Sequence, residues 1–541
     1  MKKKTLLVYN GTVVTMDPEN PQAEAVFIQG DRIEYAGSGQ EAFSKAGGDS
    51  NPAVRYIDLE GRTVVPGFND NHVHALILGD HRSVPSLAGL DAEKIVYAVT
   101  KHYPAPKPGE LLLAYEWDYP ACPNPHRKIL DDAFPDNPVV LVQFSGHGVW
   151  VNTKTLEAMG IDQSAPADSA SSAGNHTAPE DPLVRDEEGN ATGIIRDSSS
   201  NSLLMEHFKK VHRNPALARE RLETALREFR ERGITSFQDN TWFFPAILGY
   251  RRLKRHGRLT ARVSCWLFGN DPKRSALMNL PLYGGNLLTR GPWKFILDGS
   301  FSAHTGWLCE PYANDPGNYG RGVPASHIEG YLEFLLKKNR QGAFHAIGDR
   351  AVKEFLDAAE KVAGKNPRLK DFRLRIEHAQ LIRKEDIKRI RDLNILVAAQ
   401  PSALATPDKD RELLGEDRVR KAYPYRSLLD AGVRLSFGSD VPGERFLDPL
   451  FLMHLAVNRE GEEAITAEDA LRCYTVGSAY AEFEEDRKGR IKKGMFADLT
   501  VLSDNPLEVP KEKIKDIEAD MTIVGGKVMY ERPRKGKTDF F

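Results

Sequence analysis

Two histidines with one residue between them, His72 and His74, follow an apolar stretch that ends at Pro66-Gly67. In an extended segment alternate side chains share a face, so both imidazole rings can point at one metal ion. Imidazole nitrogen suits zinc or a similar divalent ion. Because a chain with 15 histidines easily produces such a pair by chance, further ligands are needed before the pair indicates a site.

Three more residues of metal-ligand type lie further along, each at or near the end of a short apolar run: His345, His378 and Asp440. A fourth candidate, Lys294, lies early in the run 293–297. Each alone has an ordinary alternative. A histidine at a strand end is commonly a core or surface residue, an Asp after Gly-Ser is usually a helix cap, and a lysine before a strand commonly reaches to solvent. Together, these positions favour a metal site.

A regular series of short apolar runs must position these residues. The runs cover 64–68, 233–238, 261–267, 293–297, 342–347, 373–379, 394–400 and 433–437. Helical patterns lie between most of them, for example at 216–232, 328–339, 350–363 and 384–393. Eight strands that alternate with helices predict an α/β fold, a (β/α)8 barrel of the TIM type. In a barrel the ends of all the strands meet, so residues distant along the chain converge.

The two ends of the chain share a different pattern. Short strands separated by turns fill residues 5–66, and similar strands return at 498–502 and 521–530. Since chain termini often lie close together, we expect 1–66 and 488–541 to form one composite β-sandwich domain around a barrel at 67–487.

One interval is too long for a barrel unit. About 160 residues separate the first apolar run from residue 233, whereas an ordinary βαβ unit needs about 30. We therefore expect residues 80–205 to be an insertion after barrel strand 1. Because such loops rise over the active face of a barrel, the insertion should line or cap the active site.

Composition excludes several classes of function. Lys and Arg (74) nearly balance Asp and Glu (76), so the formal charge of −2 gives no general attraction for nucleic acid or an anionic membrane. The four cysteines form no close pair in sequence, which is typical of a reducing compartment. The basic start and the apolar run after it are too short for a signal peptide. We expect a cytoplasmic protein with no nucleic-acid or membrane partner.

The motifs around the candidate ligands resemble those of the amidohydrolase superfamily. They are Val65-Pro66-Gly67 with His72-Val73-His74, the strand bearing Lys294, His345-Ala346-Ile347-Gly348-Asp349, Glu377-His378-Ala379-Gln380 and Gly438-Ser439-Asp440. More narrowly, the chain is similar over nearly its whole length to the YtcJ-like branch, which includes N-substituted formamide deformylases. Asn69 and Asn71 depart from that pattern, where an apolar residue and a small hydroxyl residue are usual.

The resemblance implies one or two divalent ions, zinc or another metal. The ligands that it implies are His72, His74, Lys294, His345, His378 and Asp440. Lys294 would bridge two ions after its amine is carboxylated by carbon dioxide, and the alternative is an unmodified amine beside a single ion. A carbamate would suit this position because it supplies two anionic oxygens at the end of a long side chain.

We therefore expect a metal-dependent hydrolase that cleaves a non-peptide C–N bond, in particular a linear amide such as an N-acyl or N-formyl amine. Metal-activated hydroxide would attack the carbonyl carbon, with Asp440 as general acid and base. Deamination of a ring amine, or cleavage of a cyclic amide, on the same centre is the first alternative. Deaminases of this superfamily usually carry a Glu after the histidine of the fifth strand, and none follows His345. A non-catalytic scaffold is the second alternative.

A further group of residues is expected to contact the substrate: Trp117, Asp118, His147, Trp150, Arg321 and Gln400. Aromatic rings at a pocket favour an apolar or aromatic substituent on the substrate. For Trp117 and Trp150, packing in the core of the insertion is the alternative interpretation. The partner is expected to be a small-molecule substrate, and a homodimer is compatible with the sequence.

Overall fold

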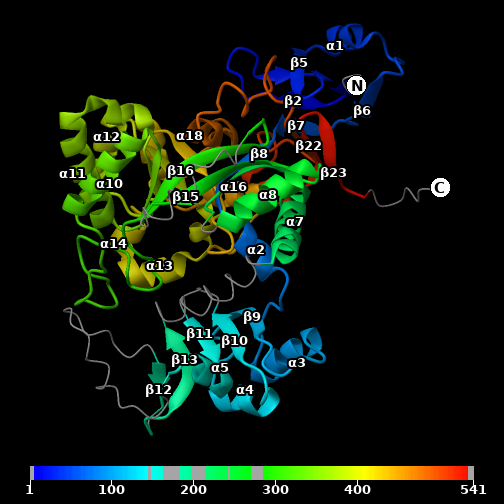
Figure 1. Cartoon of the computed structure of the whole chain (residues 1–541). Coiled ribbons are helices and arrows are strands. Elements are labelled where there is room, and N and C mark those ends of the chain that lie inside the picture. Colours follow the sequence, from blue (N-terminus) through cyan, green and yellow to red (C-terminus); the bar gives the residue numbers. More distant parts are fainter. Residues whose placement is uncertain are drawn as a thin grey trace. The chain divides into compact units, whose positions relative to one another are not determined.

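The structure is a computed structural model that describes residues 5–143, 148–161, 183–186, 188–196, 214–241, 244–269 and 284–533 (Figure 1). The chain divides into two compact units. Unit 1 consists of Met1–Ala75 with Leu226–Phe541, and unit 2 of Leu76–Ala225. Among the described residues, no helix combines the length and the apolar character needed to cross a membrane.

An eight-stranded parallel sheet in unit 1 confirms the predicted barrel. Its strands are β8 (Phe68–Val73), β14 (Ile234–Asp239), β15 (Arg262–Phe268), β16 (Leu288–Ile296), β17 (Gly342–Ala346), β18 (Arg375–His378), β19 (Leu396–Ala399) and β20 (Leu435–Phe437), each beside the next in this order. Beyond the end of β20, Asp440 N donates to His72 O at 2.7 Å and His74 N donates to Val441 O at 2.9 Å. These bonds join the chain after the last strand to the first strand.

The predicted helical patterns form helices between these strands. They are α7 (Pro215–Glu231), α10 (Ala325–Lys338), α11 (Asp349–Lys365) and α12 (Lys384–Asp392). In α11, Val352, Phe355, Ala359 and Val362 are buried at helical spacing, so one apolar stripe packs inward. In α12 Glu385 and Asp386 fall in the first turn and Arg389 and Arg391 in the last, which suits the helix dipole.

Unit 1 contains further helices, and one helix leads into unit 2. In unit 1 they include α1 (Gly39–Ala46), α8 (Phe244–Arg255), α13 (Pro407–Leu414), α14 (Glu416–Val419), α15 (Tyr425–Asp430), α16 (Pro449–Asn458), α17 (Ala467–Arg472) and α18 (Ser478–Ala481). The helix α2 (Ala75–His81) leads from β8 into unit 2.

The two chain ends build two further sheets in unit 1. One has the order β5-β4-β1-β6, with β1 at Thr5–Tyr9, β4 at Ala25–Gln29, β5 at Arg32–Gly37 and β6 at Val54–Asp58. The other has the order β23-β22-β21-β7-β2-β3, with β2 at Thr12–Val14, β3 at Gln22–Ala23, β7 at Thr63–Pro66, β21 at Leu499–Leu502, β22 at Ala519–Val524 and β23 at Lys527–Glu531. Side chains of both sheets, among them Val8 and Val501, form one hydrophobic core. Because β21 pairs with β7, the last part of the chain shares a sheet with the first.

The first barrel strand differs from the prediction of 64–68. Residues 63–66 form β7 in the six-stranded sheet, and the barrel strand β8 begins at Phe68. Gly67 N still donates to Asp498 O at 2.9 Å, so the change of sheet occurs at Gly67. A Cβ atom at Gly67 would collide with the Thr235 side chain, which explains a glycine at this crossing. The apolar run is thus shared between two sheets, and His72 lies inside a strand.

Unit 2 contains a five-stranded sheet of order β12-β13-β11-β10-β9. Its strands are β9 (Leu112–Trp117), β10 (Val139–Gln143), β11 (Gly148–Val151), β12 (Leu183–Arg185) and β13 (Ala191–Arg196). Its helices include α3 (Ala92–His102), α4 (Arg127–Ala133) and α5 (Thr153–Ala158). The predicted limits of the insertion (80–205), the barrel (67–487) and the composite domain (1–66 with 488–541) stay predictions.

Candidate metal centre

Three of the predicted ligands converge at one end of the barrel. His72 is the fifth residue of β8, His378 is the last residue of β18, and Asp440 follows β20 after Gly438-Ser439. One ligand atom from each, an imidazole nitrogen or a carboxylate oxygen, lies within 4.8 Å of the others. Residues separated by more than 300 positions in the sequence are thus brought together as the barrel predicts.

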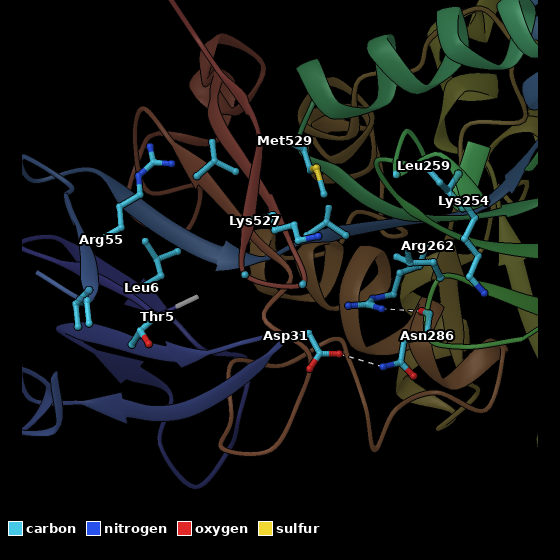
Figure 2. A pocket seen from close by; sticks show the side chains of 18 of the residues that line it. Thr5, Leu6, Asp31, Arg55, Lys254, Leu259, Arg262, Asn286, Lys527 and Met529 are labelled. Carbon is cyan, nitrogen blue, oxygen red and sulfur yellow. Dashed lines mark hydrogen bonds between the residues drawn. The ribbon is translucent and has the colours of Figure 1, made fainter. Parts of the chain in front are cut away.

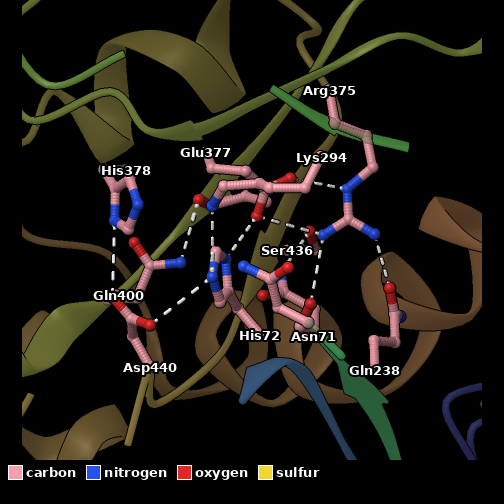
Figure 3. Close-up of polar contacts among 12 residues, drawn as sticks. Asn71, His72, Gln238, Lys294, Arg375, Glu377, His378, Gln400, Ser436 and Asp440 are labelled. Atoms are coloured by element: carbon pink, nitrogen blue, oxygen red, sulfur yellow. Dashed lines mark hydrogen bonds and ion pairs between the residues drawn. The ribbon is translucent and has the colours of Figure 1, made fainter. Parts of the chain in front are cut away.

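Asp440 is the centre of this group (Figure 3). Its Oδ1 lies 3.4 Å from His72 Nε2 and 3.3 Å from His74 Nε2, and its Oδ2 lies 3.8 Å from His378 Nδ1. The Lys294 Nζ lies 3.3 Å from His72 Nε2, so the lysine on β16 reaches the same point. His74 and Lys294 therefore adjoin the three-residue group.

His345 lies at the side of this group. Its ring centroid is 4.3 Å from that of His378. Its Nε2 is 2.9 Å from Gly299 O and 3.5 Å from Asp298 Oδ1. The structure thus brings His345 next to the cluster while its Nε2 contacts the segment after β16.

Two of the predicted ligands, His378 and Asp440, have an unusual backbone conformation. His378 has a φ of 73°, the following Ala379 has 48° and Asp440 has 58°. Consecutive side chains in a regular strand point to opposite faces, so a left-handed residue is needed for both Glu377 and His378 to face the site. Non-glycine residues in this region cost free energy and are concentrated at functional sites.

Burial sets the protonation states of the cluster. Burial, with the charge of Lys294, lowers the pKa of His72 well below its usual value, and burial with His345 does the same for His378. Burial opposes ionisation of Asp440, but His72, His74 and Lys294 outweigh it and lower the pKa of Asp440 to about 2. Near neutral pH the His72 and His378 rings are therefore neutral and the Asp440 carboxyl is ionised.

Several residues near the ligands were not assigned a role from the sequence. Asp70 Oδ1 accepts from His72 N at 3.2 Å and from Ser439 N at 2.9 Å, and so joins the two segments that carry ligands. The ring of Trp266 lies 5.0 Å from the His72 ring and under Lys294 Nζ at 5.9 Å. The signal for Asp70 is its place in the polar stretch Asn69-Asp70-Asn71, between the apolar run and His72. No sequence pattern indicates Trp266.

Two predicted substrate contacts lie in unit 1. Gln400 follows β19, is buried, donates from Nε2 to Ala398 O at 3.2 Å and interacts with the His378 ring. Arg321 is exposed in the loop before α10, where its backbone N donates to Thr305 O at 3.4 Å. The structure therefore brings Gln400 into contact with His378, a predicted ligand. The hydrogen bond of the Arg321 backbone is to Thr305 instead.

The other predicted substrate contacts belong to unit 2. Trp117 and Trp150 are fully buried in its hydrophobic core, with ring centroids 6.0 Å apart, and Trp117 Nε1 donates to Leu141 O at 2.8 Å. Both rings thus lie in the core of unit 2, and a contact of either with substrate stays a prediction. Asp118 Oδ1 accepts from Tyr119 N at 2.9 Å, and His147 lies outside the described residues. Their contact with substrate stays a prediction.

A separate cavity of about 810 Å³ lies in unit 1, between the N-terminal sheet, the β22–β23 hairpin and the segment from α8 to β15 (Figure 2). Its lining includes Arg55, Lys254, Arg262 and Lys527. None of the predicted site residues lines it, so it is distinct from the cluster around Asp440.

Comparisons with known proteins agree with this architecture. Residues 55–530 match the model of the amidohydrolase family. The chain is 28% identical to the putative amidohydrolase YtcJ of Bacillus subtilis, over 97% of this chain and 99% of that protein. It is also 28% identical to the N-substituted formamide deformylase of Arthrobacter pascens, over 98% of this chain and 99% of that protein.

A solved structure has the same fold. The crystal structure of an uncharacterized metal-dependent hydrolase from Pyrococcus furiosus superimposes with a TM-score of 0.75 at 28% identity. The similarity covers 93% of this chain and all of that one. With the family match extending over most of the sequence, the chain belongs to the amidohydrolase family.

Proposed function

We propose that this protein is a metal-dependent hydrolase that cleaves a linear, non-peptide amide, an N-acyl or N-formyl amine. The observation that carries the proposal is the convergence of His72, His378 and Asp440 within 4.8 Å at the end of a parallel barrel. Catalytic sites of such barrels lie at the carboxyl ends of the strands, where these residues are found.

The residues fit a divalent cation. Metal ligands must be deprotonated, and burial keeps the His72 and His378 rings neutral while Asp440 is ionised. A mixture of imidazole nitrogen and carboxylate oxygen suits zinc, although other divalent metals accept it. We propose that one or two ions are held by His72, His74, Lys294, His345, His378 and Asp440.

A bound divalent ion would supply Lewis acidity, which makes hydroxide available near neutral pH and polarises a carbonyl group. Asp440 accepts the proton of the attacking water while a C–O bond forms at the carbonyl carbon. It then passes this proton to the leaving nitrogen as the C–N bond breaks, giving a carboxylate and an amine. An ionised carboxyl that faces the ligand cluster is suited to both transfers.

Lys294 has two possible forms in this proposal. Burial lowers the pKa of its amine to about 8, which increases the fraction of neutral amine that can react with carbon dioxide. The carbamate would bring two anionic oxygens beside His72 Nε2, now 3.3 Å from Nζ, and would allow two ions. An unmodified amine would leave a single-ion site. Mass measurement of the intact protein with and without bicarbonate distinguishes these forms.

The proposed substrate class follows from the chemistry and from one relative. The relative from Arthrobacter pascens is called an N-substituted formamide deformylase, and it matches this chain over almost its full length. The residues Ala346-Ile347-Gly348 after His345 offer no acid to protonate a ring nitrogen, which disfavours deamination. We also propose that the protein is cytoplasmic and forms a homodimer.

A substrate panel tests this function. N-formyl amines, N-acyl amines, a dipeptide, a cyclic amide and a ring amine are each incubated with the protein, and carboxylate, amine and ammonia are measured. We expect carboxylate and amine in equal amounts from the linear amides. Ammonia from the ring amine alone would favour a deaminase, and no turnover together with no stoichiometric metal would favour a scaffold.

A further inference from the structure

A buried ion pair lies beside His72 in the interior of the barrel. Arg375 and Glu377 point the same way because they are two residues apart on β18, and neither side chain is exposed. Arg375 Nε donates to Glu377 Oε1 at 2.8 Å, and Arg375 Nη2 donates to Glu377 Oε2 at 3.3 Å. Branched apolar side chains usually fill such a barrel, so a charged pair there needs an explanation.

The carboxylate of Glu377 has a second partner. Its Oε2 lies 2.7 Å from His72 Nδ1 (Figure 3). A carboxylate at this distance accepts a hydrogen bond, so Nδ1 carries the proton and Nε2 keeps its lone pair. His72 Nε2 is the atom that faces Asp440 Oδ1 at 3.4 Å and Lys294 Nζ at 3.3 Å.

Arg375 is itself held at several points, so it can fix the carboxylate. Its Nη1 donates to Gln238 Oε1, and its Nη2 donates to Asn71 O at 3.1 Å. Gln238 Nε2 donates in turn to Ser478 O at 2.9 Å. The guanidinium also lies 4.6 Å from the ring centroid of Trp266.

A purely structural ion pair is the alternative. Burying an ion pair stabilises a protein little relative to apolar packing, because desolvation offsets the attraction. By contrast, a carboxylate that accepts the second N–H of a metal-binding histidine is the usual way in which its ring is oriented. The contact from Oε2 to His72 Nδ1 is the feature that the structural alternative does not require.

We propose that Glu377, held by Arg375 and Gln238, is a positioning residue that fixes the tautomer and orientation of His72 for metal binding. This inference rests on the proposed function, since it requires a divalent ion at His72. It adds a role for the Gln238–Arg375–Glu377 network, which contributes no atom to the ligand cluster itself.

The test compares zinc affinity in matched variants of the full chain. The dissociation constant for Zn²⁺ is measured by competition with a chromophoric chelator, and the melting temperature is recorded in parallel. Glu377→Leu removes the acceptor, and Asp498→Leu is the control, because Asp498 is also a buried carboxylate, paired with the buried Arg262 at 2.6 Å. Both variants leave a buried cation without its partner, so both should melt at lower temperature. Only Glu377→Leu should weaken zinc binding, by about 10- to 100-fold.

Two milder variants keep the test decisive if Glu377→Leu does not fold. Glu377→Asp retains the charge beside Arg375 but withdraws the carboxylate from Nδ1, so zinc affinity should still fall by at least about 5-fold. Glu377→Gln can present an amide oxygen to Nδ1–H, so it should bind zinc more tightly than Glu377→Asp. Unchanged zinc affinity in Glu377→Asp, or an equal loss in Asp498→Leu, would overturn the inference. Failure of the wild-type protein to bind zinc or another divalent ion would instead contradict the proposed function.

Discussion

At the scale of single residues, protonation and backbone conformation are compatible with the proposed binding of a cation by the cluster. Burial lowers the pKa of His72 and of His378, which favours neutral rings, and contacts with His72, His74 and Lys294 lower the pKa of Asp440 to about 2. The left-handed conformations of His378 and Asp440 carry a free-energy cost that the barrel must offset. Asp440 contacts both His72 and His74, and we propose that it both binds the ion and transfers protons.

Substitution of Asp440 separates these two roles. Asp440→Asn keeps an oxygen beside the histidines, so the protein should retain metal. The amide cannot accept and return a proton, so kcat for amide hydrolysis should fall by about 100-fold or more. Metal content by elemental analysis and steady-state kinetics check this prediction. Asp386→Asn on α12, a buried carboxylate paired with Arg389, is the control and should keep its kcat. An unchanged rate in Asp440→Asn would refute the proton-transfer role.

At the scale of elements, close approach between β8 and the chain after β20 sets the distance between two predicted ligands, His72 and Asp440. Asp70 on β8 accepts from Ser439 N at 2.9 Å, while Asp440 N donates to His72 O at 2.7 Å. A Cβ atom at Gly438 would lie 2.6 Å from His72 N and 2.5 Å from Asn71 Oδ1. Only glycine therefore allows the two segments to lie this close.

Gly438→Ala should push Asp440 away from His72. We expect weaker divalent-metal binding and a loss of about 1–3 kcal/mol in the free energy of unfolding, as for other overpacked sites. The control is Gly364→Ala in α11, where an added Cβ would meet no atom within 4 Å. That substitution should leave metal binding unchanged and raise helix stability slightly. Equal metal affinity in the two variants would show that the strand contact does not position Asp440.

At the scale of the whole molecule, hydrogen bonds and a buried ion pair connect the sheets of the chain ends to the barrel within unit 1. Arg262 on β15 forms two hydrogen bonds to Asp498, at 2.6 and 2.9 Å, and both side chains are buried. Asp498 also accepts from Gly525 N at 2.8 Å through its side chain and from Gly67 N at 2.9 Å through its carbonyl. One residue thus joins the barrel, the crossing at Gly67 and the β22–β23 hairpin.

Asp498→Ala should therefore destabilise unit 1. Breaking a buried pair leaves Arg262 charged and unpaired, which typically costs about 3–5 kcal/mol. Asp392→Ala serves as the control, because its partner Lys388 is 74% exposed and such surface pairs contribute under about 1 kcal/mol. Denaturant unfolding measures both. A loss below about 1 kcal/mol in Asp498→Ala would contradict this connecting role.

Spacing and alternation in the sequence predict the barrel, because eight apolar runs and their intervening helices leave a periodic signal. They do not predict that the run at 64–68 is divided between two sheets, because its residues on both sides of Gly67 are buried alike. Positive φ angles at His378 and Asp440 also leave no periodic trace. Asn69 and Asn71, which depart from the family pattern, donate to Glu482 at 2.8 Å and Ser436 at 2.6 Å. Such contacts depend on tertiary structure.

Removal and return of metal tests the central claim most directly. The protein is treated with a chelator, its fold is checked by circular dichroism, and hydrolysis of an N-formyl amine is measured before and after stepwise addition of Zn²⁺. We predict that the chelated protein stays folded, loses hydrolysis, and regains it with one or two equivalents of the ion. Full hydrolysis by folded protein that contains no metal would contradict the account.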